Sequence, residues 1–213
     1  MSALRTEISR VLISGMTGVL SIFALPCCSA SAQDASLSPP KPSADYAVRG
    51  KTSPDGGELH ISYSGGRMRL EVSMPTLGSM LTGIVDFSNG KTIILSDLPG
   101  MDVVGFEIEM PPEYSFANMP ANSVRGEHTS VNSEPCDIWR SAVSSQIPIE
   151  VCLTADGIPL MANVVTLRGE KMGFEATELE RAEQDPANFV VPKGVKVRRV
   201  PRGMESMIPG LKR

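Results

Sequence analysis

The chain has 213 residues, with 20 basic and 24 acidic side chains and a formal net charge of −4. This length suits one domain with a sizeable core. The acidic balance argues against a nucleic-acid partner, because nucleic acid is bound by a basic surface.

Residues 1–32 have the pattern of a secretory signal peptide. A positive start is followed by an apolar run over residues 11–25 and by Ala30-Ser31-Ala32, which fits the small-residue site read by signal peptidase. We therefore expect a periplasmic protein, cleaved after Ala32. The apolar run is too short for a comfortable span of ~20 residues, so we do not expect an integral membrane protein. Lipidation at Cys27 or Cys28 is a weaker alternative, because the residues before them match that signal poorly.

The mature chain divides into three parts by composition. Residues 33–44 contain Ser, Pro and Asp and read as a flexible leader. Residues 45–200 read as one β domain, and residues 201–213 as a loose basic tail. Removing the signal segment leaves 18 basic and 23 acidic residues, so the mature net charge is −5.

Short alternations of apolar and polar residues predict about ten strands and almost no helix. Turns are marked by Gly65-Gly66, Asn89-Gly90, Asp156-Gly157 and Gly169. Meandering hairpins imply an antiparallel sheet, which must curl or close to bury its apolar face. Outside the hairpin at 133–157, strands are expected over residues 59–63, 68–74, 84–87, 91–95, 104–110, 124–131, 160–167, 171–179 and, at an edge, within 192–200.

Two looser segments are expected to cover the sheet as lids. The first is residues 75–81, and the second is the proline-rich stretch 111–122, which is predicted to be a crossing loop with a short helical turn. Near the C-terminus, Asp185 and Pro186 have the residue types of a cap and a first helical position.

The stretch 133–157 organises the chain as a hairpin with its turn near Ser144. Residues whose numbers sum to 288 then face each other, so Cys136 lies opposite Cys152 and Trp139 lies opposite Ile149. An even cysteine pair in an exported domain is read as a disulfide; two free thiols or half of a metal site are the alternatives. One face of the hairpin is expected to carry Trp139, Ile147, Ile149, Val151 and Leu153.

Three motifs carry a resemblance to a known group. They are Cys-x-x-Trp at 136–139, Asp-Gly-Ile-Pro-Leu at 156–160 and Asp-Pro-x-x-Phe-x-x-Pro-x-Gly at 185–194. Over residues 44–200 the chain resembles uncharacterised periplasmic domains grouped near the Lol lipoprotein carriers and receptors of Gram-negative bacteria. The resemblance implies a mainly β fold: a single, strongly curved, half-open antiparallel sheet, or incomplete barrel, with short lid helices or loops. It also implies an apolar concavity that could hold acyl chains.

No catalytic constellation stands out. His60 and His128 lack a second histidine at ligand spacing, and the Gly-x-Ser-x-Gly pattern fails around Ser79. Paired acids on alternating strands are expected to solvate an outer face: Glu107 with Glu109, and Glu178 with Glu180. Copper binding by thioethers is a weak alternative, because Met204 and Met207 are the only close methionine pair. We therefore expect no enzyme, no metal and no cofactor.

Our first hypothesis is a non-enzymatic periplasmic protein that binds a lipid, a lipoprotein acyl chain or another apolar partner in the concavity. The alternative is an envelope protein-interaction or stress-sensor module with no small ligand; an enzyme working in the concavity is a third hypothesis. Adaptable apolar side chains on the lids and inner face would hold the ligand. The residues expected to do so are Leu77, Met80, Leu81, Phe106, Tyr114, Phe116, Met119 and Trp139.

Overall fold

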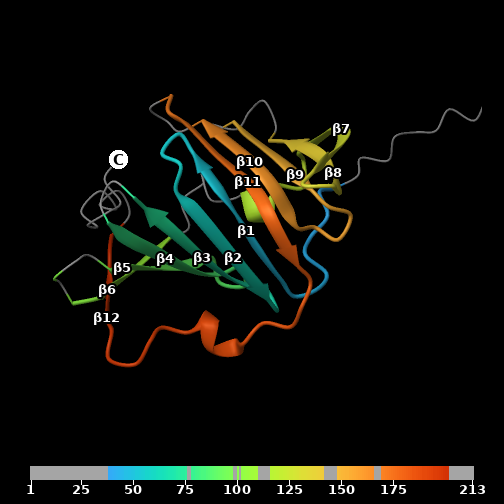
Figure 1. The fold of residues 1–213 in the computed structure, drawn as a ribbon. Helices are drawn as coiled ribbons and strands as arrows, with labels where there is room; N and C mark the ends of the chain where they lie inside the picture. Colours follow the sequence, from blue (N-terminus) through green and yellow to red (C-terminus); the bar gives the residue numbers. More distant parts are fainter. Residues whose placement is uncertain are drawn as a thin grey trace, which may run out of the picture. The chain divides into compact units, whose positions relative to one another are not determined.

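The computed structural model describes residues 38–75, 78–97, 100, 102–109, 116–141, 148–165 and 169–201, all within one compact unit, Ala35–Arg213. The expected signal peptide, its cleavage site and most of the C-terminal tail lie outside these residues. The described chain is mainly β, as predicted, and its twelve strands form one sheet (Figure 1). The strands are β1 (Tyr46–Ser53), β2 (Glu58–Ser64), β3 (Arg67–Met74), β4 (Ser79–Asp86), β5 (Lys91–Asp97), β6 (Val104–Glu109), β7 (Val124–Val131), β8 (Glu134–Arg140), β9 (Ile149–Leu153), β10 (Pro159–Val165), β11 (Lys171–Glu180) and β12 (Lys196–Arg199).

The sheet consists of two meanders placed side by side. Its order is β12-β6-β5-β4-β3-β2-β1-β11-β10-β9-β8-β7, so β1 and β11 join the two halves. The sheet is not closed, because β12 and β7 are its two end strands. β12 pairs with β6 in parallel, whereas every other pair in this order is antiparallel. The expectation of a purely antiparallel sheet is therefore wrong at this edge, because the chain crosses from β11 to the far end of the sheet before β12 begins.

Glycine-containing turns set several of the hairpins, as the sequence predicted. Gly65 and Gly66 between β2 and β3 have φ angles of 53° and 80°, and Gly90 between β4 and β5 has 66°. These left-handed conformations are accessible to glycine at little cost. The resulting registers place Leu59 opposite Val72 in the first of the two hairpins.

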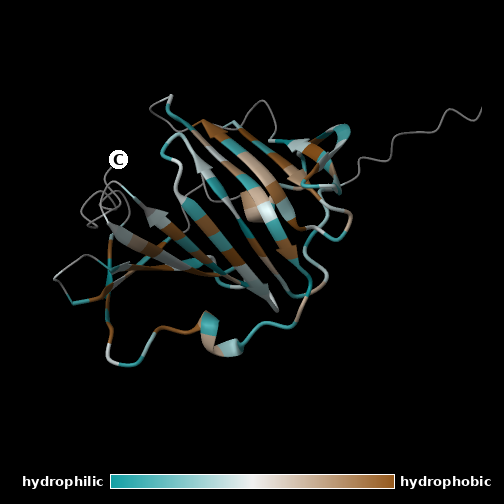
Figure 2. Ribbon diagram, viewed as in Figure 1, coloured by the Kyte–Doolittle hydropathy of each residue, from teal (hydrophilic) through white to brown (hydrophobic). Residues whose placement is uncertain are grey.

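Alternation along the strands gives the sheet a buried inner face. We call inner the face that carries Tyr46 and Val48 of β1, and outer the opposite face. Figure 2 shows apolar and polar residues alternating along β2, β3 and β11. The same core cluster contains inner-face side chains from both meanders: Ile61, Met68, Leu70, Val85, Trp139, Ile149, Val151, Ala162, Phe174 and Ala176.

The central hairpin, β8 and β9, confirms the disulfide and corrects its register. Cys136 and Cys152 are bonded, with Cα atoms 5.5 Å apart. However, Cys152 lies opposite Ile138, and Trp139 lies opposite Val151, so the strands are displaced by two residues from the predicted pairing. The disulfide thus joins diagonal neighbours. A displacement of two preserves the alternation, so Trp139 still points to the face opposite the disulfide.

The first predicted lid is wrong in part, because β4 begins at Ser79. Met80 and Leu81 are strand residues that pair with Ser73 and Val72 of β3, rather than parts of a covering loop. Leu77 lies outside the described residues. In the second expected lid, residues 116–118 form one helical turn, as predicted, and its earlier part is not described.

A C-terminal segment crosses the outer face before β12. Its short helix η2 (Pro186–Phe189) begins as predicted, with the Asp185 carboxylate accepting a hydrogen bond from the Ala187 N–H at 2.8 Å. Arg69 of β3 donates to the Asn188 carbonyl at 3.2 Å. The Arg67 guanidinium lies 5.8 Å from the centre of the Phe189 ring. These contacts fix the path that leads the chain to the free edge of β6.

Candidate functional site

Four of the six described residues that were predicted to bind an apolar ligand are buried core residues. Phe116, Met119 and Trp139 belong to one buried cluster, with exposed fractions of 7%, 6% and 3%. Leu81 is buried in a second, smaller cluster, against which the half-buried Phe106 packs. Met80 points to the outer face and is 46% exposed. Leu77 and Tyr114 lie outside the described residues, so the structure brings together three of the eight.

The helical turn at 116–118 contributes core side chains rather than a separate cover. Phe116 and Met119 are in the same cluster as Tyr46, Val151 and Phe174 from the inner face. On the described strands that contribute to this cluster, the inner face is therefore packed against the protein's own side chains. Two grooves lie elsewhere, one of about 330 Å³ on the outer face and one of about 580 Å³ near the ends of β5, β6 and β12.

The outer-face groove is charged. It crosses β11, β1, β2, β3 and β4, and is lined by Arg49, Gly50, Lys51, Glu58, Leu59, His60, Glu71, Ser73, Met80, Thr177 and Glu178. Cross-strand pairing places Arg49 between Glu178 and His60, and His60 opposite Glu71. Two basic side chains, Arg49 and His60, thus lie between two acidic ones across four strands. Such a lining favours a polar partner, because an acyl chain would leave these groups without water or partners.

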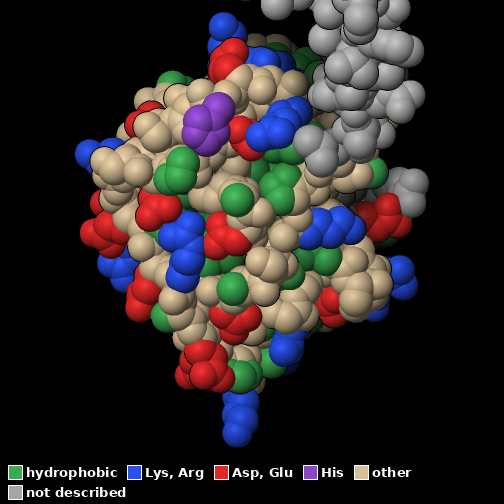
Figure 3. Space-filling view, turned by 90° about the vertical axis from the view of Figure 1, so that its right-hand side faces the viewer, with side chains coloured by type: hydrophobic (Ala, Val, Ile, Leu, Met, Phe, Trp, Pro, Cys, Tyr) green, Lys and Arg blue, Asp and Glu red, His purple; other side chains and the backbone are tan. Residues whose placement is uncertain are grey.

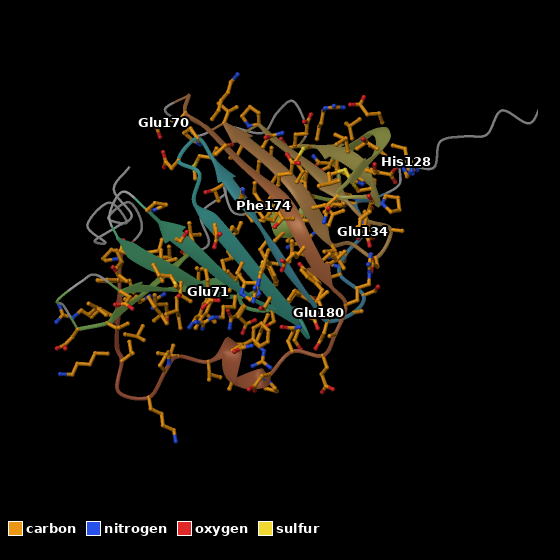
Figure 4. The ribbon with its side chains drawn as sticks, in the orientation of Figure 1. Glu71, His128, Glu134, Glu170, Phe174 and Glu180 are labelled. Atoms are coloured by element: carbon orange, nitrogen blue, oxygen red, sulfur yellow. A yellow bond between two sulfur atoms is a disulfide. The ribbon has the colours of Figure 1, made fainter. Side chains whose placement is uncertain are left out.

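Glu71 of β3 lies at the end of this row (Figure 4). Its carboxylate accepts a hydrogen bond from Arg69 at 2.8 Å and lies 3.2 Å from Nδ1 of His60. Partial burial acts to raise the pKa of Glu71, but the hydrogen bonds and charges of Arg69 and His60 outweigh it and hold the pKa below its usual value. Glu71 is therefore an ion-pair partner here and is not poised as a general acid near neutral pH.

A second histidine–acid pair lies at the other end of the sheet, where Figure 4 shows His128 on β7. Nδ1 of His128 is 2.9 Å from Asp137, which also accepts a hydrogen bond from Arg125 at 2.6 Å. Burial acts to raise the pKa of Asp137, but these two partners lower it. The His128 side chain is 71% exposed, which agrees with the predicted solvated position.

The sequence analysis identified the acid partner of neither His60 nor His128, although the hairpin positions indicate both. Glu71 faces His60 across the hairpin centred on Gly65-Gly66, and Asp137 faces His128 across the hairpin centred on Asn132-Ser133. No group of three His, Cys, Asp or Glu side chains that could hold a metal ion occurs among the described residues. Within that same part of the chain, no helix has the length and apolar character needed to cross a membrane.

The described part of the face that Figure 3 shows carries no large uniform patch. The view in Figure 3 shows basic and acidic side chains interspersed, with small groups of hydrophobic side chains between them. Several of these charges are paired across elements. Arg181 donates to Asp156 at 2.7 Å and to Glu134 at 3.2 Å, which ties the end of β11 to β8 and to the turn before β10.

No family model matches the chain, and no curated protein matches it. A structure of PNGF-II is similar with a TM-score of 0.48 and 14% identity, over 74% of this chain and 31% of that one. An uncharacterized conserved protein from Thermus thermophilus gives 0.47 and 15%, over 74% and 91%. The Pseudomonas aeruginosa MucA/MucB complex gives 0.42 and 14%, over 70% and 56%. The chain thus spans about a third of the PNGF-II chain, and likenesses this distant assign neither family nor activity.

Proposed function

We propose that this chain is an exported, non-enzymatic protein-interaction module of the bacterial envelope, with no small apolar ligand. The observation that carries the proposal is the burial of Phe116, Met119 and Trp139 in one core cluster. Side chains that already pack against the sheet gain no new burial from an acyl chain, whereas an empty apolar concavity would gain ~0.8 kcal/mol per CH₂.

The accessible features of the described chain support a polar, protein-like partner. The outer-face groove is lined by charges of both signs, and the open sheet has two end strands. Exposed strand edges and complementary charges are the features by which one polypeptide recognises another. Stable burial of a disulfide between Cys136 and Cys152 supports an oxidising compartment, and hence the periplasmic location expected from the signal sequence.

Two measurements test this function together. Purified mature protein is titrated with fluorescent acyl probes of increasing chain length, and we expect no saturable binding. Saturable binding that strengthens with chain length would overturn the proposal in favour of the acyl-chain carrier.

The positive test is photo-crosslinking in the cells that make the protein. A photoreactive residue is placed in turn at exposed sites on the outer face, on β7 and on β12, and at the buried Ile61 as the matched control. We expect discrete protein adducts from some exposed sites and none from Ile61. Adducts to lipid alone, or the same background at every position, would contradict an interaction module.

A further inference from the structure

The outer edge of β12 is an exposed strand edge with its backbone geometry defined. The Val200 N–H donates to the Glu107 carbonyl at 2.9 Å, in continuation of the parallel pairing with β6. Backbone groups alternate in direction along a strand, so those of Lys196 and Arg198 also point to β6. The N–H and C=O of Val197 and Arg199 therefore point away from the sheet, and no described strand pairs with them.

This edge is strongly basic, although the chain as a whole is acidic. Three of the four β12 residues are basic, all four are exposed, and Lys193 lies just before them. Arg199 is 3.8 Å from Glu107, a carboxylate that it shares with Lys91. Lys196 and Arg198 form no ion pair with any residue that the structure describes. Among the described residues, the positive charges of Lys196 and Arg198 are therefore not neutralised by an ion pair.

These charges restrict which strand could be added. Like charges placed opposite each other in a sheet are destabilising, so the pairing of β12 with β12 of a second copy of this chain is disfavoured. The same residues favour a strand with acidic side chains, because cross-strand pairs of opposite charge are stabilising. The other end strand, β7, is less suitable: its pairing with β8 is broken between Arg125 and His128, and its charges are of both signs.

We propose that the outer edge of β12 accepts an extended, acidic segment of a partner protein as a thirteenth strand. The inference rests on the proposed interaction function and names its docking edge and the chemistry of its partner. Val197 and Arg199 supply the main-chain hydrogen bonds. Lys196 and Arg198, both on the inner side of the sheet, meet carboxylates at alternate positions of the added strand, which project to that same side.

The test uses two synthetic peptides of equal charge. One is an extended ten-residue peptide in which glutamate alternates with threonine, and the other replaces each threonine by proline, which has no N–H to donate. Binding to the mature protein is measured by fluorescence anisotropy at ~0.05 M salt, where surface charges are weakly screened. We expect saturable binding of the threonine peptide and at least tenfold weaker binding of the proline peptide.

Three variants locate the site. Lys196→Glu/Arg198→Glu should weaken binding at least about tenfold, because two favourable pairs become repulsive. The matched control Lys41→Glu/Lys171→Glu makes the same charge change at exposed residues elsewhere and should change affinity less than twofold. Val197→Pro removes an outward N–H without removing a bond to β6, and should abolish binding while the urea midpoint of unfolding stays within the error of the wild type.

Several results would overturn the inference. Equal binding of both peptides would show charge attraction without strand addition. Binding of vesicles made of equal parts phosphatidylglycerol and phosphatidylethanolamine, with no binding of the peptides, would assign the basic edge to a membrane surface. Crosslinks in cells from the outer face or β7 but none from β12 would retain the interaction module and refute this edge. Crosslinks from no position would refute the proposed function itself.

Discussion

Gly50 in β1 lies where the two meanders join, and its replacement by alanine should be severely destabilising. The pairing of β1 with β11 shifts register between Arg49 and Gly50, which brings Gly50 opposite Ala176. A Cβ atom at Gly50 would overlap the carbonyl oxygen of Glu175 and the ring of Phe174. The ring can rotate away, but the carbonyl belongs to the paired backbone of β11 and cannot move without breaking the ladder.

Gly83 in β4 offers a matched control in the same sheet. A Cβ atom there would lie 3.7 Å from Cβ of Leu70 and 3.8 Å from Cδ1 of Ile94, which is ordinary van der Waals contact. Overpacking costs ~1–3 kcal/mol, and we expect Gly50→Ala to lie at the upper end because the obstacle is backbone. Gly83→Ala should instead stabilise the protein by ~0.5–1 kcal/mol, because glycine in a strand carries an entropic cost.

Urea unfolding of the mature, oxidised protein measures both effects. With a slope of ~2 kcal/mol per M, Gly50→Ala should lower the midpoint by ~1.5 M and Gly83→Ala should raise it by a few tenths of a molar. Adding Phe174→Leu to Gly50→Ala should recover only part of the loss, because the Glu175 carbonyl remains. Equal shifts for the two glycines, or full recovery in the double variant, would refute the argument from the β1–β11 junction.

Three further predictions concern the fold. Replacing both cysteines by serine in Cys136→Ser/Cys152→Ser should lower the free energy of unfolding by ~3 kcal/mol, because the bond closes a loop of about 15 residues and thereby restricts the unfolded chain; a midpoint equal to that of the oxidised wild type would contradict this. Asp156 has a lowered pKa, chiefly because of the Arg181 hydrogen bond, so its stabilisation is present above the ordinary aspartate pKa of 3.8 and is lost as pH falls through the lower folded value. Arg181→Gln should therefore be less stable than wild type at pH 7, and the difference should shrink in strong acid; a constant difference in unfolding midpoint would exclude this linkage. Trp139 should emit as a buried indole and resist iodide quenching, whereas red-shifted, fully quenched emission would show that it is wet.

Local turn chemistry explains most of what could be predicted. Two-residue turns such as Gly65-Gly66 and Asn89-Gly90 fix the register of their hairpins, and Asp185 with Pro186 begins η2 as expected. The predicted register of β8 and β9 is wrong by two residues, because the connection between these strands is longer than a two-residue turn. No dipeptide in such a connection specifies where pairing starts, whereas alternation still specifies the face.

Non-local pairing explains what could not be predicted. β1 joins β11 across more than a hundred residues, and β12 joins β6 in parallel; no short-range pattern encodes either choice. The same missing information decides where the predicted ligand-binding residues lie. Phe116 and Met119 have the residue types of an adaptable lid, and only the assembled sheet shows that they pack in the core cluster. By contrast, the acid partners of His60 and His128 could have been found from the hairpin centres alone.

Binding of a partner protein and binding of an acyl chain should depend on salt in opposite ways. The inner face of the described chain packs in the core, whereas the outer-face groove and the edges of β7 and β12 are accessible to a partner. Binding at those places depends on exposed charges, and their attraction decreases as salt shortens the Debye length from ~10 Å at 0.1 M to ~3 Å at 1 M. Burial of an acyl chain is strengthened by excluded salts such as sulfate. Affinity for the natural partner should therefore fall as ammonium sulfate is added, and an affinity that rises instead would mean that the inner face opens to admit the ligand.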